Sequence, residues 1–404
     1  MLNTPFPPWP SFTQQEADKI HAVLLSNKVN YWTGTETREF EKEFAEWAGC
    51  EYAVAVANGT LALDSALNAL EINHGDEVIT TPRTFLASVS SIVTAGASPI
   101  FADVDLNSQN ITASNIANVL TSKTKAVIVV HLAGNPAEMD EIMALSREYG
   151  FYVIEDCAQA HGAKYKGRPV GSIGDIGAWS FCQDKIMTTG GEGGMVTTNN
   201  KTLWEKMWSY KDHGKSYDAV YNKSHPPGFR WLHDSFGTNW RMTEIQAAIG
   251  RLQLAKMPQW NKLRNKNAQA ISRECEKHRA LRVPKLNCAT CEFPCDNYSG
   301  CVNAAYKYYV FVNHDKLQKG WDRDRVMSAI NERGIPCFSG SCSEVYLERA
   351  FDNTSFKPKK RLQNAKRLGE DSLMFLVHPT LTEENIKDTC AAIAAVMLEA
   401  SLDV

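Results

Sequence analysis

The amino-acid sequence predicts an α/β fold: a mostly parallel sheet with helices on both faces, followed by a smaller C-terminal α+β domain. Two observations carry this prediction. Between residues 51 and 250, short runs that are apolar on both faces alternate with stretches of helical periodicity, as is typical of parallel sheets that are buried on both sides. Beyond that point one alternating strand stands among helical segments, which indicates a second domain.

The first two strand–helix units show the pattern most clearly. "EYAVAVA" (51–57) predicts a strand, and residues 61–70 follow as a helix with leucines recurring on one face. "DEVITT" (76–81) predicts the next strand, which leads to a second helix over 86–96. Further short apolar runs, bounded by Gly, Asp or Asn, predict the remaining strands: 98–105, 126–134, 151–158, 176–182 and 193–198.

A long helical pattern over 243–278 connects the two parts of the chain. We expect this helix to be interrupted near Pro258, because proline lacks the N–H group that a helix interior needs. The strand "AAYKYYVFV" (304–312) then alternates between apolar and other residues. We therefore predict a large domain over 1–250 and a small domain over 251–404.

Composition excludes several classes of partner. The 404 residues are 44% hydrophobic and 22% charged, which is typical of a globular protein. A net charge of −3 gives no electrostatic reason to expect nucleic acid or a membrane surface as a partner. The start of the chain lacks the pattern of a secretory signal, and no apolar run approaches the roughly 18 residues of a transmembrane helix. We expect a cytoplasmic protein.

Four of the eleven cysteines crowd into "CATCEFPCDNYSGC". The spacing of Cys288, Cys291, Cys295 and Cys301 is tight enough to bring four thiolates around a structural zinc ion. It matches no strong zinc pattern, however, and clustered thiols in a reducing compartment also stay free. We expect no metal in the chemistry and keep structural zinc as the weaker alternative for this segment.

Polar residues follow several of the predicted strands. Asp156 and Gln159 close one strand, Ser180 ends another, and Gly59 and Thr60 lie between the first strand and its helix. Ligands of open α/β sheets bind beyond the carboxyl ends of the strands, so these residues are candidates for one site. The start of the helix offers unpaired N–H groups and the positive end of the helix dipole, which suit a phosphate.

Lys185 stands between a predicted strand and a glycine-rich turn, whereas most lysines are solvated surface charges. An amine, the Asp156 carboxylate, a phosphate cradle and the aromatic Phe85 are what pyridoxal phosphate requires. Taken singly, Asp156 could cap a helix, Ser180 could be a satisfied strand-end hydroxyl and Phe85 could belong to the core. The glycines of 190–194 could form an ordinary hairpin turn. The joint occurrence of these residues along one plausible sheet favours the cofactor.

Seven segments spread over nearly the whole chain carry these residues: "ANGTLAL" (57–63), "PRTFLASVSS" (82–91), "PIFADVD" (99–105), "VIEDCAQAHGA" (153–163), "SFCQDKIMTTGGEGG" (180–194), "TNWRMTEIQAAIG" (238–250) and "HPTLTEENI" (378–386). In sequence and in order they resemble the DegT/DnrJ/EryC1/StrS family of pyridoxal-phosphate-dependent sugar aminotransferases. The resemblance implies the three-layer fold type I, with a mostly parallel seven-stranded sheet and a smaller C-terminal domain. It also implies a homodimer with active sites at the subunit interface.

The resemblance assigns roles around the cofactor ring. Lys185 is implied to be the Schiff-base lysine, which also moves the proton during transfer. Asp156 is implied to pair with the ring nitrogen and Gln159 to approach the ring hydroxyl. Phe85 is implied to stack on the face of the ring.

The resemblance also implies how the cofactor phosphate is held. Ser180 and the backbone amides around Gly59 and Thr60 are implied to bind it, and Asn239 to reach it from the neighbouring subunit. The alternative for Asn239 is that it caps the helix that follows in its own chain. His161 lies in a matching segment, and we expect it to be a packing or orienting residue.

One position separates reaction types. Some relatives have histidine in place of the lysine and act as sugar dehydratases, so Lys185 favours transamination. We expect an amino group to pass from an amino acid, glutamate by resemblance, to a keto-sugar used for amino-sugar and polysaccharide biosynthesis. A nucleotide-linked hexose is the expected acceptor; a free keto-sugar acid and an inosose-type cyclitol stay open.

The alternatives are a sugar dehydratase and a non-catalytic regulatory protein on the same fold. A nicotinamide dehydrogenase would need a G-x-G-x-x-G turn, which "ANGTLAL" does not supply.

Overall fold

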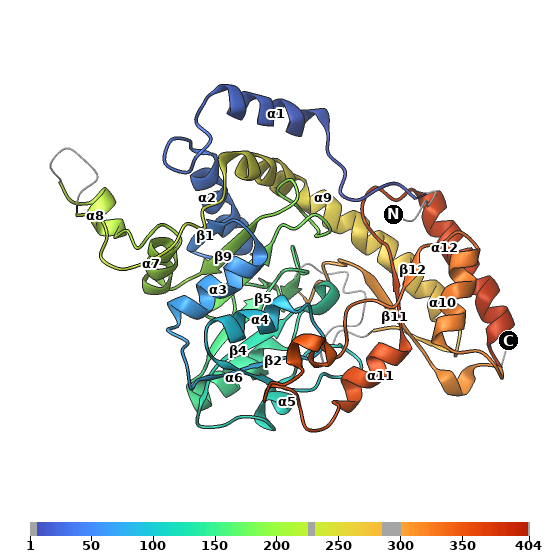
Figure 1. The fold of residues 1–404 in the computed structure, drawn as a ribbon. Coiled ribbons are helices and arrows are strands. Elements are labelled where there is room, and N and C mark those ends of the chain that lie inside the picture. The colour runs from blue at the N-terminus through green and yellow to red at the C-terminus, as the bar shows by residue number, and fades with distance from the viewer. Residues whose placement is uncertain (1–5, 225–230, 285–299, 403–404) are drawn as a thin grey trace.

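The computed structural model describes residues 6–224, 231–284 and 300–402. A seven-stranded sheet with the order β1-β9-β8-β5-β4-β2-β3 forms the centre of the large part of the molecule (Figure 1). Strand β9 runs antiparallel to its neighbours β1 and β8, and the other neighbouring pairs are parallel, which confirms the predicted fold class. The strands are β1 (Tyr52–Val56), β2 (Glu77–Thr80), β3 (Ser98–Phe101), β4 (Thr124–Val130), β5 (Tyr152–Asp156), β8 (Ile176–Ser180) and β9 (Gly194–Thr198).

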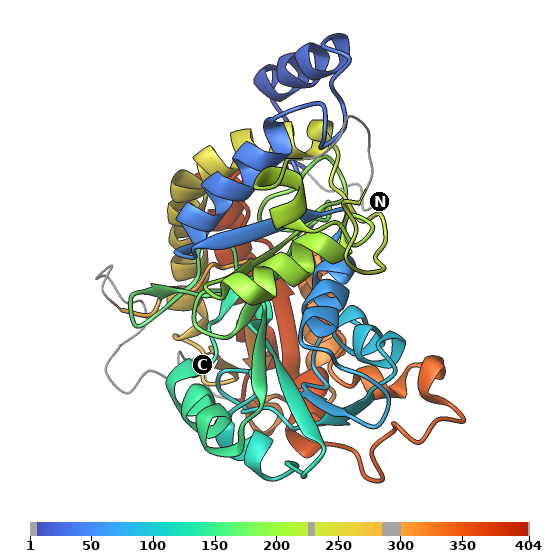
Figure 2. The ribbon, with the colours of Figure 1, turned by 90° about the vertical axis from the view of Figure 1, so that its left-hand side faces the viewer.

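Helices cover both faces of this sheet, because successive side chains of each strand point to opposite sides. One face packs against α3, α4 and α7. The other packs against α2 and α9 near β1 and β8, and against α5 and α6 near β2 and β4. Figure 2 shows β1 between α2 and α7. These helices are α2 (Glu36–Ala48), α3 (Gly59–Ala69), α4 (Ala87–Thr94), α5 (Ala113–Ala117), α6 (Met139–Tyr149) and α7 (Lys201–Tyr210).

Helix α9 (Glu244–Cys275) is continuous through Pro258, so the predicted interruption at this proline is wrong. Pro258 is exposed, and the carbonyl group of Leu254, one turn earlier, loses the helical hydrogen bond that an N–H group at position 258 would supply. Leu254 and Met257, which neighbour Pro258 on the helix surface, are buried in the core. Packing of α9 against α1, α2 and α12 outweighs the local preference for a break.

A smaller antiparallel sheet with the order β10-β11-β13-β12 lies in the C-terminal part. One face packs on the end of α9 and on α10 and α12, and the other contributes Tyr309 and Phe311 to the core that α3 and α7 share. The division of the chain at residues 250 and 251 stays a prediction, and α9 passes through it. The elements are β10 (Leu281–Arg282), β11 (Tyr308–Val312), β12 (Cys337–Phe338), β13 (Ser372–Phe375), α10 (Arg323–Glu332), α11 (Gln363–Asp371) and α12 (Glu383–Ala400).

The remaining elements lie outside the two sheets. Helix α1 (Gln14–Leu25) packs on α9, and α8 (Tyr217–Tyr221) packs on α7. The short strands β6 (Lys164–Tyr165) and β7 (Arg168–Pro169) form a hairpin. Among the described helices, none is both long and apolar enough to cross a bilayer.

Candidate active site

The carboxyl ends of β1 and β8 meet at the junction that was predicted to bind phosphate. Asn58 caps α3, because its side chain accepts the N–H group of Leu61 at 3.0 Å. Gly59 lies directly against Ser180: a Cβ atom on Gly59 would stand 2.5 Å from the Cβ atom and 2.8 Å from the hydroxyl oxygen of Ser180. Glycine is therefore required for this approach. The first amides of a helix have no acceptor within it, so those of Gly59 and Thr60 can bind an anion beside the Ser180 hydroxyl.

Asp156 ends β5 at the same edge of the sheet, and its side chain is buried. One carboxylate oxygen accepts the hydroxyl of Ser88 at 2.8 Å, and the other accepts the N–H group of Ala158 at 3.1 Å. Burial raises the pKa of Asp156, against these two hydrogen bonds and the positive charge of Lys185. No helix follows Asp156 directly, so the alternative that it caps one is wrong.

Lys185 lies in the connection between β8 and β9, and its side chain is only 15% exposed. Its Nζ atom stands 3.5 Å from a carboxylate oxygen of Asp184 and 5.3 Å from the centre of the Tyr306 ring. The Tyr306 hydroxyl donates to the other oxygen of Asp184. Burial alone would raise the pKa of Asp184, but the Lys185 ammonium and the Tyr306 hydroxyl lower it. From the N-terminal segment, the indole N–H group of Trp9 donates to the Lys185 carbonyl at 2.8 Å.

Two further candidate residues differ in exposure. Gln159 is buried, and its side-chain oxygen accepts the N–H group of Ala133 at 2.8 Å, which ties the loop after β5 to the loop after β4. Phe85 is 71% exposed in the single chain. The alternative that Phe85 belongs to the core is therefore wrong.

Asn239 is exposed and lies in a segment that pairs with Asp212 through a backbone bridge. It does not cap α9. The cap is Thr243, whose hydroxyl accepts the N–H group of Gln246 at 3.3 Å while the Gln246 side chain binds back to Thr243. The alternative role for Asn239 is therefore wrong.

His161 is fully buried between two aromatic rings, 5.3 Å from Trp179 and 5.7 Å from Phe181 between ring centres. Burial, with the positive charges of Lys185 and Arg264, lowers its pKa to about 3. The imidazole is therefore neutral and packs in the core behind the site.

Three of the four clustered cysteines, Cys288, Cys291 and Cys295, lie outside the described residues. Cys301 is buried, and its sulfur accepts the N–H group of Lys166 at 3.3 Å. The zinc alternative for this segment stays a prediction.

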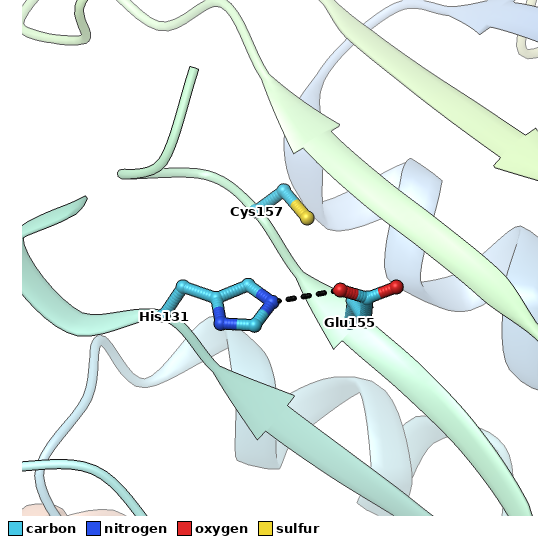
Figure 3. Close-up of side chains that lie close together, drawn as sticks. All are labelled: His131, Glu155 and Cys157. Atoms are coloured by element: carbon cyan, nitrogen blue, oxygen red, sulfur yellow. Dashed lines mark hydrogen bonds and ion pairs between the residues drawn. The ribbon is translucent and has the colours of Figure 1, made fainter. Parts of the chain in front are cut away.

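A second cluster of potential metal ligands lies beneath the strand ends (Figure 3): His131, Glu155 and Cys157, with ligand atoms within 4.8 Å of one another. The imidazole Nδ1 accepts the N–H group of Ala137 at 3.0 Å, so Nε2 carries the proton that it donates to Glu155 at 2.9 Å. Burial and the neighbouring Glu155 and Asp156 raise the pKa of the Cys157 thiol far above its usual range. The imidazole and the thiol thus keep their protons, the carboxylate accepts hydrogen bonds from its neighbours, and we assign no metal to the cluster.

The Glu155 carboxylate holds this network together, because it also accepts three backbone N–H groups. Those of Gly171, Ile173 and Gly174 lie 2.9, 2.8 and 2.7 Å from its oxygens. Glu155 points to the opposite face of β5 from its neighbour Asp156, so it supports the strand end without entering the site. Burial alone would raise its pKa, but the hydrogen bonds from His131 and the backbone lower it.

We expect Glu155→Gln to lower the free energy of unfolding by about 1–3 kcal/mol, since an amide cannot accept four donors. The lowered pKa means that the charged carboxylate stabilises the fold above the unfolded value of 4.5 and that this contribution is lost as the pH falls through the lower folded value. Denaturant titrations at neutral and at acidic pH check both statements. Glu332→Gln, at an exposed position, is the control. Equal stability of the two variants at neutral pH would contradict the prediction.

Sequence reasoning missed three residues around the site: Ser88, Asp184 and Tyr306. Ser88 lies in the helix predicted over 86–96, three residues after Phe85, and nothing in the local sequence marks its hydroxyl as a partner of Asp156. Asp184 stands next to Lys185 in the sequence. Tyr306 gave no signal, because 122 residues separate it from its partner Asp184.

Comparison with known proteins identifies the family of this chain. The chain matches the sequence profile of the DegT/DnrJ/EryC1/StrS aminotransferase family over residues 10–394. The chain belongs to this family. The family resemblance drawn from the sequence is thus confirmed, as is the prediction of an enzyme with transaminase activity.

Relatives of the DegT/DnrJ/EryC1/StrS family include an aminotransferase from Psychrobacter cryohalolentis, whose X-ray structure has a TM-score of 0.94 and 62% sequence identity over 98% of this chain and 99% of that one. The spore coat polysaccharide biosynthesis protein SpsC of Bacillus subtilis is 31% identical over 95% of both chains. A GDP-perosamine synthase of Escherichia coli O157:H7 is 44% identical over 61% of this chain and 64% of its own.

Proposed function

We propose that this protein uses pyridoxal phosphate to transfer an amino group from an amino acid to a keto-sugar. The observation that carries the proposal is the meeting of three groups at one edge of the sheet. The Lys185 amine, the buried Asp156 carboxylate and the cradle of Gly59 and Ser180 come from separate segments, and each suits a different part of this cofactor. The relatives named for polysaccharide and GDP-sugar biosynthesis support a sugar as the acceptor.

The residues of the site fit the cofactor by chemistry. When bound, pyridoxal phosphate supplies an electron-withdrawing ring that accepts electron density from the carbon bearing the amine. Lys185 would hold the cofactor and carry the proton that moves during transfer, and Asp156 would keep the ring nitrogen protonated. Gln159 would bind the ring hydroxyl and Phe85 would cover the ring. Ser180 and the amides of Gly59 and Thr60 would hold the phosphate.

We further propose L-glutamate as the donor and a nucleotide-linked keto-hexose as the acceptor, in the synthesis of amino sugars for a polysaccharide. The lysine at 185 supports transfer of the amine over dehydration, because an amine is needed both to hold the cofactor and to move the proton. The purified protein is expected to be yellow and to lose its visible absorption on addition of L-glutamate, with release of 2-oxoglutarate. A protein that stays colourless after incubation with pyridoxal phosphate would contradict the proposal.

We propose that each active site is shared between two subunits of a homodimer. Phe85 and Asn239 are exposed in the single chain although both are assigned to the cofactor site. Trp231 and Phe236 are 81% and 100% exposed in the segment just before Asn239, and large exposed apolar side chains favour an interface. In a two-fold dimer, Lys185 of one subunit and Asn239 of the other would serve the same site.

Mixing two inactive variants tests the shared site. Lys185→Ala removes the amine, and Asn239→Asp places a negative charge against the phosphate. A mixed dimer then carries both changes in one site and neither in the other, so about a quarter of wild-type activity is expected after full random exchange of equal amounts. If both residues serve the site of their own chain, every site in the mixed dimer is damaged and activity stays at the level of the variants. Native mass spectrometry confirms that mixed dimers form.

A further inference from the structure

A buried arginine without a carboxylate partner lies close to Lys185. Arg264, in the middle of α9, is 1% exposed, and its Nη1 atom donates to the carbonyl groups of Ala305 and Tyr306 at 3.4 and 3.2 Å. Among the described residues, nothing accepts a hydrogen bond from its Nε and Nη2 atoms. Burial lowers its pKa to about 9, so the guanidinium is still charged at neutral pH. Such a group is costly unless an anion pairs with it.

Further positive charges face the same region. The Nζ atoms of Lys185 and Lys307 lie 5.3 and 5.2 Å from the centre of the Tyr306 ring. Burial lowers the pKa of Lys307 to about 8, and the positive charges of Arg264 and Lys185 add to this effect. Two carboxylates face these lysines within the described part of the chain: Asp184 faces both, and Asp156 faces Lys185. Neither carboxylate pairs with Arg264, whose Nε and Nη2 atoms have no acceptor among the described residues.

The other titratable neighbours do not supply an anion. Burial, with the charges of Arg264 and Lys307, lowers the pKa of His378 to about 3, so its imidazole is neutral. His161 is neutral for similar reasons. Burial and the charge of Asp184 raise the pKa of Tyr306, so its phenol keeps its proton.

We propose that Arg264 and Lys307 bind the α-carboxylate of the amino-acid donor beside Lys185. This inference rests on the proposed function, which places the donor amine at Lys185. The α-carboxylate is attached to the carbon that bears this amine, so an anion site next to Lys185 is where it has to lie. The Nε and Nη2 atoms form one edge of the guanidinium with two parallel N–H groups, which matches the two oxygens of a carboxylate.

Trp9 covers this arginine. The guanidinium carbon of Arg264 lies 4.9 Å from the centre of the Trp9 ring, and the same indole donates to the Lys185 carbonyl. Because Arg264 is 1% exposed, binding of the donor to its free edge requires the side chains that cover it to move. The N-terminal segment that contains Trp9 thus forms part of the wall of the donor site.

Binding of glutarate to the cofactor-loaded enzyme tests the proposal without turnover, because this dicarboxylate has no amine to transfer. We expect Arg264→Gln and Lys307→Gln to weaken glutarate binding about ten- to a hundredfold in calorimetric titrations, the loss typical of a hydrogen bond to a charged group. Arg282→Gln is the matched control, since Arg282 is a partly buried arginine that donates to the Leu106 carbonyl at 2.9 Å. The visible absorption of each resting variant reports that the cofactor is still bound.

Two comparisons separate the donor from other anions. L-isoglutamine has an amide in place of the α-carboxylate. The wild-type enzyme should therefore lose its visible absorption only at much higher concentrations of L-isoglutamine than of L-glutamate. This difference in concentration should shrink in Arg264→Gln and Lys307→Gln. Titration with GDP or UDP should be unaffected by either substitution. Unchanged glutarate binding, or weakened nucleotide binding in its place, would overturn the proposal. A wild-type enzyme that does not respond to L-glutamate would instead contradict the proposed function itself.

Discussion

Lys185→Ala protein is expected to bind pyridoxal phosphate and to lose transamination by roughly 10⁴-fold or more, the scale of loss when a covalent and proton-transferring residue is removed. We assign both tasks to one amine, which the structure holds in a largely buried position between Asp184 and the ring of Tyr306. The loss is measured as the rate of the half-reaction with L-glutamate. Cofactor binding is measured by titrating the variant with pyridoxal phosphate and following the absorbance.

Two controls define the specificity of this result. Lys206→Ala removes a surface lysine whose Nζ atom lies 2.6 Å from Glu71, and it should leave the rate unchanged. Lys307 presents a second ammonium to the Tyr306 ring, so Lys185→Ala/Lys307→Gln shows whether it supplies any residual rate. Near wild-type turnover by the alanine variant would show that the catalytic amine is elsewhere.

Asp156→Asn is expected to lower the rate by roughly 10²–10³-fold, the scale for losing one preorganised electrostatic group, with a much smaller effect on cofactor affinity. The amide oxygen can still accept from Ala158, and the amide nitrogen can donate to the hydroxyl of Ser88. The geometry is thus kept while the charge that would hold the ring nitrogen protonated is removed.

Asp175→Asn is the matched control for Asp156→Asn. Asp175 precedes β8 at the opposite end of the sheet, and its carboxylate accepts the N–H group of Val153 at 2.7 Å. It should affect stability more than rate. If Asp156→Asn transfers amino groups at the wild-type rate, the partner of the ring nitrogen is a different residue.

The edge of the sheet could be predicted from the sequence because its signals are local. Apolar runs mark the strands, and parallel strands bring their carboxyl ends to one edge, so Asp156, Ser180 and Gly59 lie together without any knowledge of long-range contacts. The alternatives for Phe85 and Asn239 failed because burial and capping depend on neighbours that the local pattern does not reveal.

Contacts between distant segments could not be predicted in this way. Trp9 and Lys185 are 176 residues apart, yet the indole binds the lysine carbonyl. The unpaired charge of Arg264 depends on where α9 meets the strand that begins after Tyr306. Pro258 misled the prediction because local backbone preference was weighed without the packing of α9 on its neighbours.

Transfer of isotopic nitrogen from donor to sugar tests most directly whether this chain is a sugar aminotransferase. The enzyme is incubated with L-glutamate labelled with ¹⁵N and with nucleotide-linked keto-sugars, and the products are analysed by mass spectrometry. We expect ¹⁵N in an amino sugar in a one-to-one ratio with 2-oxoglutarate, and no labelled sugar with Lys185→Ala. A deoxygenated sugar without the label, or unchanged glutamate with every keto-sugar that is supplied, would contradict this function.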